Sequence, residues 1–343
     1  MRVKAWADVE TWLGQPISPD PEILAERKWP RVTLVTPSYQ QAPYLGETIQ
    51  SVLLQGYPEL EYFVFDGGSS DGSKVILEAY HHQLTYWESA PDRGQSHAIN
   101  KGWRRASGKY LWWLNSDDLL TPGSLFRSVA YLEDHPGIGM VYGDLLLIDE
   151  HGGILGPKTY ADFDYGQVLQ SGQDISQAGG LMRRSCIGQA GFLNEDLHFM
   201  MDLEYWHRLA LAGIGIQHLS EYQALFRVYD ETKTQSSSPR VVEERYHIAR
   251  MIEENASMKE YPGLNVDRLW SNTYLISGRN CAKAGSFGKG ARECWRSLRR
   301  RPRRVFDANW WHTLLINLAG LILGRTIWLR LRSRKRSFIE SGR

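Results

Sequence analysis

Two adjacent carboxylates, Asp117 and Asp118, stand at the end of an apolar run near the middle of the chain. The run starts at position 110 and reads Tyr-Leu-Trp-Trp-Leu, and Asn115 and Ser116 separate it from the acids. Carboxylate oxygens are ligands that Mg²⁺ and other hard cations prefer. Acids at a strand end also serve as turn residues that cap the next helix. The pattern therefore predicts a metal site or a turn, and both interpretations of Asp118 stay open.

Three earlier runs of apolar and β-branched residues also end in polar residues. We expect strands at residues 32–35, 62–65, 84–87 and 110–114. The polar residues that follow the first three are Ser38, Tyr39, Asp66, Asp92 and Arg93. Loops are polar simply because they lie at the surface, but four polar exits in succession indicate a site. In a parallel sheet these exits share one edge, which is where ligands of open α/β folds bind.

Segments with helical spacing alternate with these strands. We expect helices at residues 44–55, 74–80 and 124–134, and another that ends near residue 106. Thr121 is placed to cap the helix at 124–134, with Pro122 as its first residue. Short connections between alternating strands and helices predict an α/β fold, with a Rossmann-like, mostly parallel sheet flanked by helices.

A further carboxylate, Asp202, lies near the start of a later helix. Leu203, Trp206 and Ala210 fall at the spacing of a buried helix face. An acid in the first helical turn commonly does no more than complement the helix dipole. On its own, Asp202 is therefore not marked as catalytic.

Five segments, taken in order, resemble the inverting family 2 glycosyltransferases with the GT-A fold. They are Val35–Tyr39, Phe65–Ser73, Pro91–Ser96, Asn115–Asp118 and Met201–Trp206. Each segment alone is a weak signal, but their order and separations are specific. The resemblance covers roughly Arg31 to Arg227.

The resemblance implies a nucleotide-diphosphate sugar donor, with a UDP-sugar favoured, bound across the strand exits. The residues implied to hold the nucleoside are Thr36, Pro37, Ser38, Tyr39 and Asp66, with Arg93 nearby. Asn115, Ser116 and Asp117 stand at the family's metal-binding Asp-x-Asp position, followed by Asp118, which implies Mg²⁺ or Mn²⁺. Asp202 stands where the family has its general base.

Four residues depart from the family pattern. Asn115 replaces the first aspartate of the commoner Asp-Ser-Asp-Asp form, which leaves metal ligation mainly to Asp117, with Asp118 as a second candidate ligand. Gly67 and His97 occupy positions where relatives often have acids, and Met201 precedes Asp202 where the family often has glutamate. Glu204 competes with Asp202 for the role of base, although the two point to different sides of a helix.

The last third of the chain is expected to be helical. Small residues between positions 275 and 298 favour one helical hairpin. Residues 310–323 are the most apolar stretch, but at roughly 14 residues they fall short of the ~20 that span a bilayer. Basic residues at 325–336 follow. This arrangement favours a helix on an anionic membrane surface over a packed helix with a solvated tail.

Composition limits the alternatives. With 42% hydrophobic and 23% charged residues, the chain has the composition of a globular protein. Its three cysteines are too few and too irregular for a disulfide framework or a zinc site. The first residues lack the apolar core of a signal peptide. We therefore expect a cytoplasmic protein, peripheral on the inner face of the plasma membrane, and no nucleic-acid motif is present.

The sequence is thus expected to comprise an N-terminal arm (1–29), a glycosyltransferase domain (30–238), a helical accessory region (239–304) and an apolar and basic helix (305–343). The leading hypothesis is an inverting, metal-assisted transferase that adds a sugar to a glycan or lipid-linked acceptor in surface or extracellular polysaccharide assembly. The polar, glycine-rich region 173–182 is a candidate active-site loop. A catalytically inactive sugar-nucleotide-binding scaffold and a nucleotidyltransferase are the alternatives.

Overall fold

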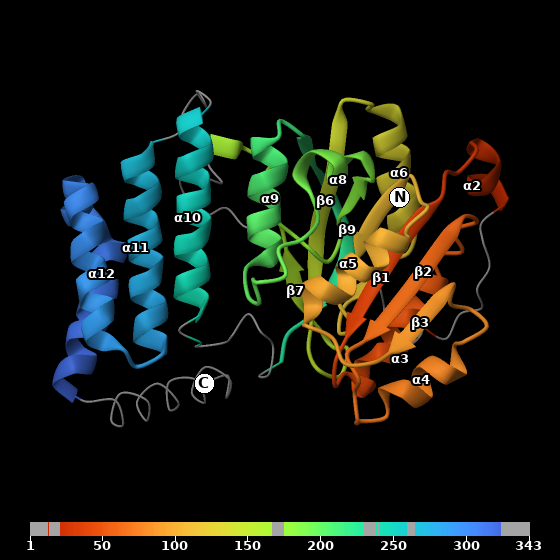
Figure 1. The fold of residues 1–343 in the computed structure, drawn as a ribbon, viewed down its shortest axis with the longest axis horizontal. Coiled ribbons are helices and arrows are strands. Elements are labelled where there is room, and N and C mark those ends of the chain that lie inside the picture. Colours follow the sequence, from red (N-terminus) through yellow and green to blue (C-terminus); the bar gives the residue numbers. More distant parts are fainter. Residues whose placement is uncertain are drawn as a thin grey trace. The chain divides into compact units, whose positions relative to one another are not determined.

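A computed structural model describes residue 13 and residues 21–166, 175–229, 238, 240–258 and 265–323. The chain divides into two compact units, whose helices and strands are labelled in Figure 1. The first unit comprises Met1–Phe163 and Asp174–Thr232, and the second comprises Asp164–Gln173 and Lys233–Arg343. Of the expected arm at 1–29, the structure describes α2 (Pro21–Glu26) and the residues after it, where Trp29 packs against Tyr57 and Phe126 in the main core.

The first unit is built on one mixed sheet with the strand order β3-β2-β1-β4-β8-β6-β9-β5, and β7 pairs with β6. Its parallel half consists of β1 (Val32–Ser38), β2 (Leu60–Asp66), β3 (Tyr86–Ser89) and β4 (Tyr110–Trp113). Ser38 pairs with Asp66, and Asp66 pairs with Ser89, so these strands end at the same edge. The prediction of a parallel sheet with a shared exit edge is confirmed for this half.

Helices connect the parallel strands, as the apolar spacing predicts. They are α3 (Ala42–Leu53), α4 (Ser73–Ala79) and α5 (Gln95–Arg105). The buried face of α3 contains Leu45, Ile49 and Val52, which lie three and four residues apart and therefore share one side of the helix. Helix α5 packs against β1 and β2.

The other half of the sheet mixes parallel and antiparallel pairs. Its strands are β5 (Leu119–Leu120), β6 (Ile138–Ile148), β7 (Ile154–Lys158), β8 (Leu181–Arg183) and β9 (Gly215–Arg227). Strand β8 runs antiparallel to both β4 and β6, whereas β9 runs parallel to β6. Gly180 precedes β8, and a Cβ atom there would lie 2.0 Å from the Trp112 ring, so only glycine lets this backbone cross the indole.

The strand expected at 110–114 is confirmed as β4, and the chain turns after it at Asn115–Asp118 before Leu119–Leu120 pair antiparallel with β9. One expectation about this segment, the helix cap at Thr121, is wrong. Helix α6 begins at Ser124 and ends at Asp134, after Gly123 in a left-handed conformation. Thr121 does not cap α6, since its hydroxyl donates to the backbone oxygen of Tyr222 at 2.6 Å. The Thr121 hydroxyl thus forms a hydrogen bond with β9 and not with the start of α6.

Stacked tryptophans join β4 to α9 (Met201–Leu211) inside the core of the first unit. Trp206 of α9 stacks on Trp112 at a centroid distance of 5.4 Å and on Trp113 at 5.6 Å. All three side chains are at most 1% exposed. Each such aromatic pair adds about 0.5–1.5 kcal/mol beyond its area burial. The stack therefore fixes the helix that contains Asp202 to the strand that leads to Asp117.

The second unit is helical where it is described. It contains α10 (Arg240–Met258), α11 (Val266–Lys283), α12 (Phe287–Arg300), a 3₁₀ helix (Pro302–Phe306) and a helix over residues 308–323. Helices α11 and α12 form the helical hairpin that the small residues at 275–298 predict. The core of the hairpin includes Leu275, Cys294 and Trp310. The basic segment at 325–336 lies outside the described residues.

The tryptophan stack gives a stability prediction. Trp206→Ala should lower the free energy of unfolding by about 3–5 kcal/mol, the range for deletion of a buried aromatic side chain. Urea unfolding followed by circular dichroism measures this loss. Trp295→Ala is the matched control, because Trp295 is 55% exposed and should change stability far less. Equal effects of the two substitutions would contradict a structural role for the stack.

Candidate active site

The polar exits of β1, β2 and β3 converge at one place. The backbone nitrogen of Gly67 donates to the Ser38 oxygen at 2.8 Å, and that of Ala90 donates to the Asp66 oxygen at 3.0 Å. A Cβ atom on Gly67 would lie 3.2 Å from the Tyr39 ring and 3.3 Å from an Asp92 carboxylate oxygen. An acid at position 67 would therefore crowd the ring and place a second negative charge beside Asp92. This contact gives a physical reason for the glycine.

Asp66 shapes the loop after β2. It is 2% exposed, and its carboxylate accepts hydrogen bonds from the backbone nitrogens of Gly68 and Ser69 and from the hydroxyls of Ser69 and Ser89. A carboxylate offers about four acceptor positions, so the protein itself satisfies Asp66. Contact between Asp66 and a nucleoside stays a prediction.

The residues predicted to hold the nucleoside at the end of β1 differ in exposure. Thr36, Pro37 and Ser38 are buried, and the Thr36 hydroxyl lies 2.9 Å from the Tyr62 hydroxyl. Tyr39 is 63% exposed. Of these four side chains, Tyr39 is therefore the one whose ring is open to a ligand.

Asn115 belongs to a chain of three amides. The Gln177 amide nitrogen donates to the backbone oxygen of Trp113 at 3.0 Å, so its oxygen is left to accept from Asn115 at 2.9 Å. The Asn115 oxygen in turn accepts from the Gln95 amide at 2.7 Å. An aspartate at position 115 could not donate to Gln177. The amide chain thus explains the asparagine, whose oxygen is engaged by Gln95 and whose nitrogen is engaged by Gln177.

Asp117 lies in the turn after β4 with a partly exposed carboxylate. Its Oδ2 atom accepts a hydrogen bond from the Tyr229 hydroxyl at 2.9 Å, and that hydroxyl accepts one from the Gln41 amide at 3.2 Å. Burial, and then the charge of Asp117, raise the pKa of Tyr229, so the hydroxyl keeps its proton and stays a donor. Tyr229 therefore orients Asp117, a role that no sequence motif indicated.

Asp118 is placed differently from its neighbour. It is 1% exposed, and its Oδ1 atom accepts from the backbone nitrogen of Arg227 at 3.1 Å. Its Oδ2 atom has no hydrogen-bond partner among the described residues. Burial, and then the charge of Asp117, raise the pKa of Asp118 well above its usual range. Asp118 does not cap α6, whose N-cap is Gly123 without a side-chain hydrogen bond; its carboxylate instead holds the end of β9, and a role in metal binding stays a prediction.

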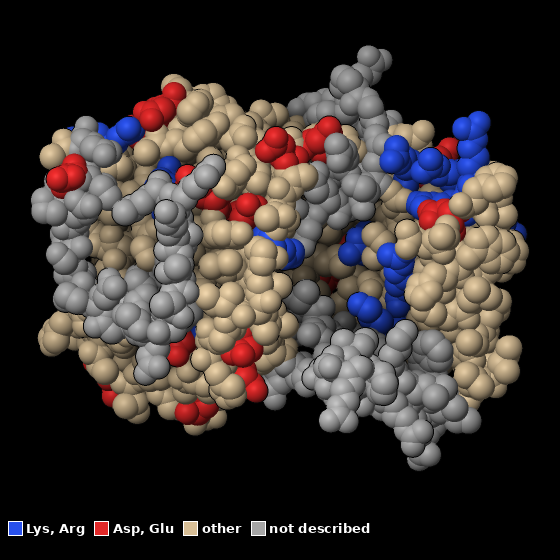
Figure 2. Space-filling view, turned by 180° about the vertical axis from the view of Figure 1, so that it is seen from behind, with Lys and Arg blue, Asp and Glu red and all other residues tan. Residues whose placement is uncertain are grey.

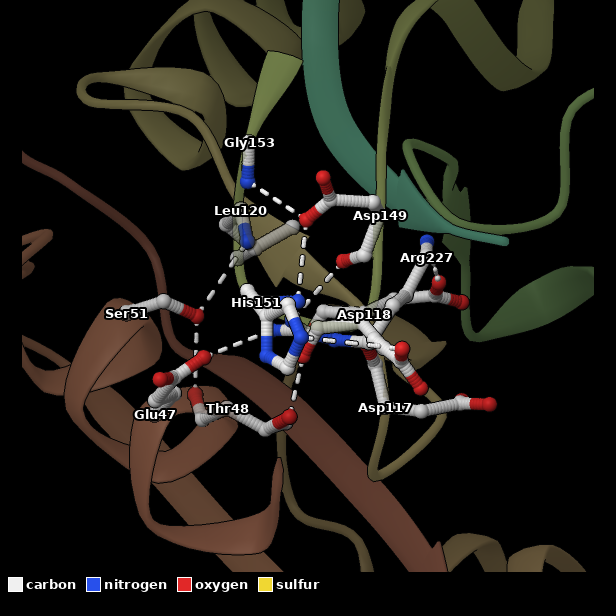
Figure 3. A network of polar contacts seen from close by, with 11 residues as sticks. Glu47, Thr48, Ser51, Asp117, Asp118, Leu120, Asp149, His151, Gly153 and Arg227 are labelled. Carbon is white, nitrogen blue, oxygen red and sulfur yellow. Dashed lines mark hydrogen bonds and ion pairs between the residues drawn. The ribbon is translucent and has the colours of Figure 1, made fainter. Parts of the chain in front are cut away.

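Arg227, at the end of β9, ties the surrounding segments together (Figure 3). Its guanidinium donates to the backbone oxygens of Asp117 at 3.0 Å, Asp149 at 3.2 Å and Glu150 at 3.1 Å, and pairs with the Glu47 carboxylate at 2.6 Å. The arginine is 1% exposed, so these partners satisfy a charge that water does not reach. The sequence signal that could have found it is an arginine at the end of the apolar run Ala-Leu-Phe.

Asp202 is the second residue of α9, and its side chain is partly exposed. The start of α9 is held against α5, where the Ser96 hydroxyl lies 2.8 Å from the Met201 sulfur. Gln95, the residue before Ser96, donates to Asn115. These contacts place the first turn of α9 beside the strand-exit edge. The same packing explains the methionine at position 201. Its side chain is 5% exposed, so a glutamate there would place a charged group in a buried position.

Glu204 is occupied by an internal ion pair. It is 3% exposed, and its two oxygens accept from the Nε and Nη2 atoms of Arg208 at 2.7 and 2.8 Å. Both Glu204 oxygens are therefore engaged by Arg208 within the helix, and the choice between Asp202 and Glu204 as the base stays a prediction.

Arg93 extends from the β3 exit towards the segment before α9. It pairs with Glu195, which also accepts from Asn100 at 2.9 Å and from Arg104 at 3.3 Å. Burial alone would raise the pKa of Glu195, but the hydrogen bonds outweigh it and lower the pKa to about 2. His97, the third departure, accepts a long hydrogen bond of 3.4 Å from the Arg93 backbone.

Comparison with known proteins identifies the family to which the strand-exit segments belong. A model of the family described as "Glycosyl transferase family 2" matches residues 33–182. Residues 33–182 belong to glycosyl transferase family 2. The matched residues include the ends of β1, β2 and β3 and the Asn115–Asp118 turn. The family match and the glycosyltransferases that resemble this chain show that it is a glycosyltransferase.

Two bacterial relatives illustrate the similarity in sequence. An uncharacterized glycosyltransferase of Mycobacterium tuberculosis (strain H37Rv) is 28% identical over 184 residues, which cover 53% of this chain and 70% of the relative. The putative teichuronic acid biosynthesis glycosyltransferase TuaG of Bacillus subtilis (strain 168) is 26% identical over 237 residues, which cover 67% of this chain and 91% of the relative.

Solved structures show the GT-A fold. S. aureus TarS, in complex with UDP-GlcNAc, matches with a TM-score of 0.56 and 17% identity, covering 88% of this chain and 92% of that one. The mannosyltransferase PcManGT from Pyrobaculum calidifontis, in complex with GDP-Man and Mn²⁺, matches with a TM-score of 0.50 and 18% identity, covering 91% and 92%. The predicted GT-A fold is thereby confirmed.

The described residues contain no group of three or more histidine, cysteine, aspartate or glutamate side chains arranged to hold a metal ion. Within the same residues, no helix is long and apolar enough to cross a membrane.

The low pKa of Glu195 predicts a pH dependence of stability. Because the folded pKa is about 2 and the ordinary value is 4.5, the carboxylate stabilises the fold fully above about pH 4.5 and loses this contribution as the pH falls towards 2. Glu195→Gln should therefore cost about 1–2 kcal/mol at pH 7 and progressively less below pH 4.5. Urea unfolding at several pH values measures the difference. Glu78→Gln, at an exposed site on α4, is the control, and a cost for Glu195→Gln that does not change with pH would contradict the ion-pair role.

Proposed function

We propose that this glycosyltransferase moves a sugar from a nucleotide-diphosphate donor to a hydroxyl of a glycan or lipid-linked acceptor, with inversion and with help from a metal. One observation carries the proposal. The partly exposed carboxylate of Asp117, oriented by Tyr229, stands at the exit of β4, and the helix start with Asp202 is tied to the same edge through Met201 and Ser96.

The donor proposal has two supports. TarS and PcManGT, which share the fold, are described in complex with UDP-GlcNAc and GDP-Man respectively. In this chain the exposed ring of Tyr39 lies beside Gly67 at the convergence of three strand exits, where a flat nucleobase could stack. We favour a UDP-sugar as the donor and place Arg93 nearby.

The residues fit a metal that the protein holds by few ligands. Asp117 is the suitable carboxylate, whereas Asn115 is committed to Gln95 and Asp118 is buried. Mg²⁺ is commonly held by one or two carboxylates, with water and substrate phosphates completing its shell. When bound, such an ion would stabilise the charge that develops on the diphosphate leaving group. Asp117 would hold it, and Tyr229 would keep Asp117 oriented.

Asp202 is proposed as the general base. An acceptor hydroxyl becomes a good nucleophile when a positioned carboxylate takes its proton. With the base on the opposite face of the sugar from the diphosphate, one in-line displacement inverts the anomeric carbon without a covalent intermediate. The Trp206 stack fixes the helix that carries the base, and Arg208 engages both oxygens of Glu204.

Paired substitutions test the roles of these carboxylates. Asp117→Asn and Asp202→Asn should each lower transfer at least about 100-fold, the lower range for loss of a positioned acid or base. Asp118→Asn keeps the shape of a neutral carboxyl and should retain activity within about threefold. Transfer is measured with a panel of UDP-, GDP- and dTDP-sugars, with Mn²⁺, with Mg²⁺ and with chelator. Donor hydrolysis that persists in chelator would contradict metal assistance, and a protein that only binds the donor would show no turnover at all.

We propose surface or extracellular polysaccharide assembly as the biological setting. The name of TuaG links that relative to teichuronic acid biosynthesis. The glycosyltransferase relative of M. tuberculosis is bacterial as well. The acceptor proposed here is accordingly a growing bacterial glycan or its lipid-linked precursor.

We also propose that the helix over residues 308–323 lies on a membrane surface. Four of its exposed apolar side chains recur at helical spacing: Trp311 at 44% exposure, Leu315 at 58%, Leu318 at 39% and Ile322 at 83%. Residues three, four and seven apart share one face, so these side chains form a continuous apolar stripe. An amphipathic helix of this kind buries its apolar face at the lipid headgroup boundary.

Vesicle binding tests the membrane proposal. The double variant Leu315→Glu/Ile322→Glu should reduce the fraction that sediments with anionic phosphatidylserine vesicles at least fivefold, because it places two charges in the apolar stripe. Asn309→Glu is the control on the opposite side of the same helix and should bind nearly as well as the wild type. If the wild-type protein fails to sediment with these vesicles, or the double variant sediments equally, the helix is not a membrane anchor.

A further inference from the structure

Helices α10, α11 and α12 line an open surface groove of about 620 Å³ within the second unit. Its lining includes three aromatic rings, Tyr246 from α10 and Trp270 and Tyr274 from α11. The rings lie against one another, with centroid distances of 6.1 Å for Tyr246–Trp270 and 5.5 Å for Trp270–Tyr274. The volume falls within the range of small-molecule binding sites, about 300–1,000 Å³.

Four arginines complete the lining. Arg296, Arg299 and Arg300 come from α12 and Arg250 comes from α10, and all four are exposed. Positions 296, 299 and 300 are separated by three and four residues, so their side chains share one face of the helix. Figure 2 shows lysine and arginine side chains gathered on the part of the surface at the right of the view.

Carboxylates neutralise only part of this charge. Arg296 pairs with the buried Glu293 at 3.0 Å, and Arg300 pairs with Asp267 at 3.0 Å. A third carboxylate, Glu253, accepts a hydrogen bond from the Trp270 indole at 2.9 Å. Within the described residues, Arg250 and Arg299 have no carboxylate partner. The groove therefore combines aromatic faces with two guanidinium groups that lack a counter-charge.

We propose that this groove binds a segment of an anionic glycan, one that carries carboxylate or phosphate groups on its sugars or polyol units. Guanidinium groups bind both kinds of oxyanion through paired N–H donors. The C–H faces of sugar rings are weakly positive and lie well on the negative faces of aromatic rings. The inference rests on the proposed function, because it identifies the acceptor of the transferase as an acidic polymer held by the helical unit.

A glycan explains the groove better than the other anionic ligands. Arginine and aromatic side chains also bind single-stranded nucleic acid. However, the proposed function gives this chain a glycan or lipid-linked acceptor, and no recognised nucleic-acid motif accompanies the arginines.

Equilibrium binding to the full chain, without donor, tests the inference. The probes are oligogalacturonate, which carries carboxylates, a poly(glycerol phosphate) oligomer, which carries phosphates, a neutral dextran oligomer of matched length, and a single-stranded thymidine oligonucleotide. Calorimetry is run on the wild type, on Arg250→Ala/Arg299→Ala and on Arg292→Ala/Arg303→Ala. The second double variant removes the same charge from exposed arginines that do not line the groove.

The groove variant should weaken binding of at least one acidic glycan about tenfold or more, and the control variant less than threefold. The neutral oligomer should bind at least tenfold more weakly than the acidic glycan. The glycan that binds tells whether carboxylate or phosphate is preferred.

Three results would overturn the inference: no wild-type binding of either acidic glycan, equal losses in the two variants, or tighter binding of the oligonucleotide with the same dependence on Arg250 and Arg299. Metal-dependent donor hydrolysis is measured on the same preparations. If the wild type hydrolyses the donor but binds no acidic glycan, only the inference about the groove is contradicted. If the wild type does not hydrolyse the donor, the proposed function itself is contradicted.

Discussion

The buried guanidinium of Arg227 is the interaction on which the arrangement of the site depends. A charge removed from water is costly unless every donor finds a partner. Here three backbone oxygens and the Glu47 carboxylate accept hydrogen bonds from the guanidinium. None of these partners lies in the strand that ends with Arg227. Because the guanidinium is planar and its donors have fixed directions, the partners must keep their positions. Arg227, more than a hundred positions later in the chain, therefore fixes the turn that contains Asp117.

The amide chain through Asn115 fixes the same turn from the other side. One backbone oxygen, that of Trp113, determines the orientation of Gln177, then of Asn115, and finally of Gln95. Gln95 begins α5, whose next residue contacts Met201. The departure from the family pattern at position 115 therefore links β4, α5 and the start of α9. Compared with an aspartate, Asn115 removes one acidic side chain from the site. It adds hydrogen bonds that connect the end of β4 with α5 and, through α5, with the start of α9.

Sequence patterns could predict the parallel half of the fold, because apolar strands and helices with regular spacing alternate there with short connections. They could not predict that Leu119–Leu120 form a second strand or that Thr121 bonds to Tyr222, because both outcomes depend on pairing with β9, about a hundred residues later. The same limit applies to the site. Asp117 and Asp202 could be named from motifs, whereas Tyr229, Gln177 and Arg227 act through contacts that only the folded chain reveals.

Carboxylates are common along the strand-exit edge, and their hydrogen bonds separate structural residues from reactive ones. An acid whose lone pairs are filled by internal donors cannot also bind a cation or take a proton without breaking those bonds. Asp66 is filled by its own loop, Glu204 by Arg208 and Glu195 by two arginines and an asparagine, while Asp118 is buried beneath the turn. Asp117 and Asp202, the proposed metal ligand and base, are both partly exposed, and within the described residues neither is engaged by an arginine in the way that Glu204 and Glu195 are. The division of labour among these acids thus follows from how completely the fold satisfies each one, which composition and spacing cannot reveal.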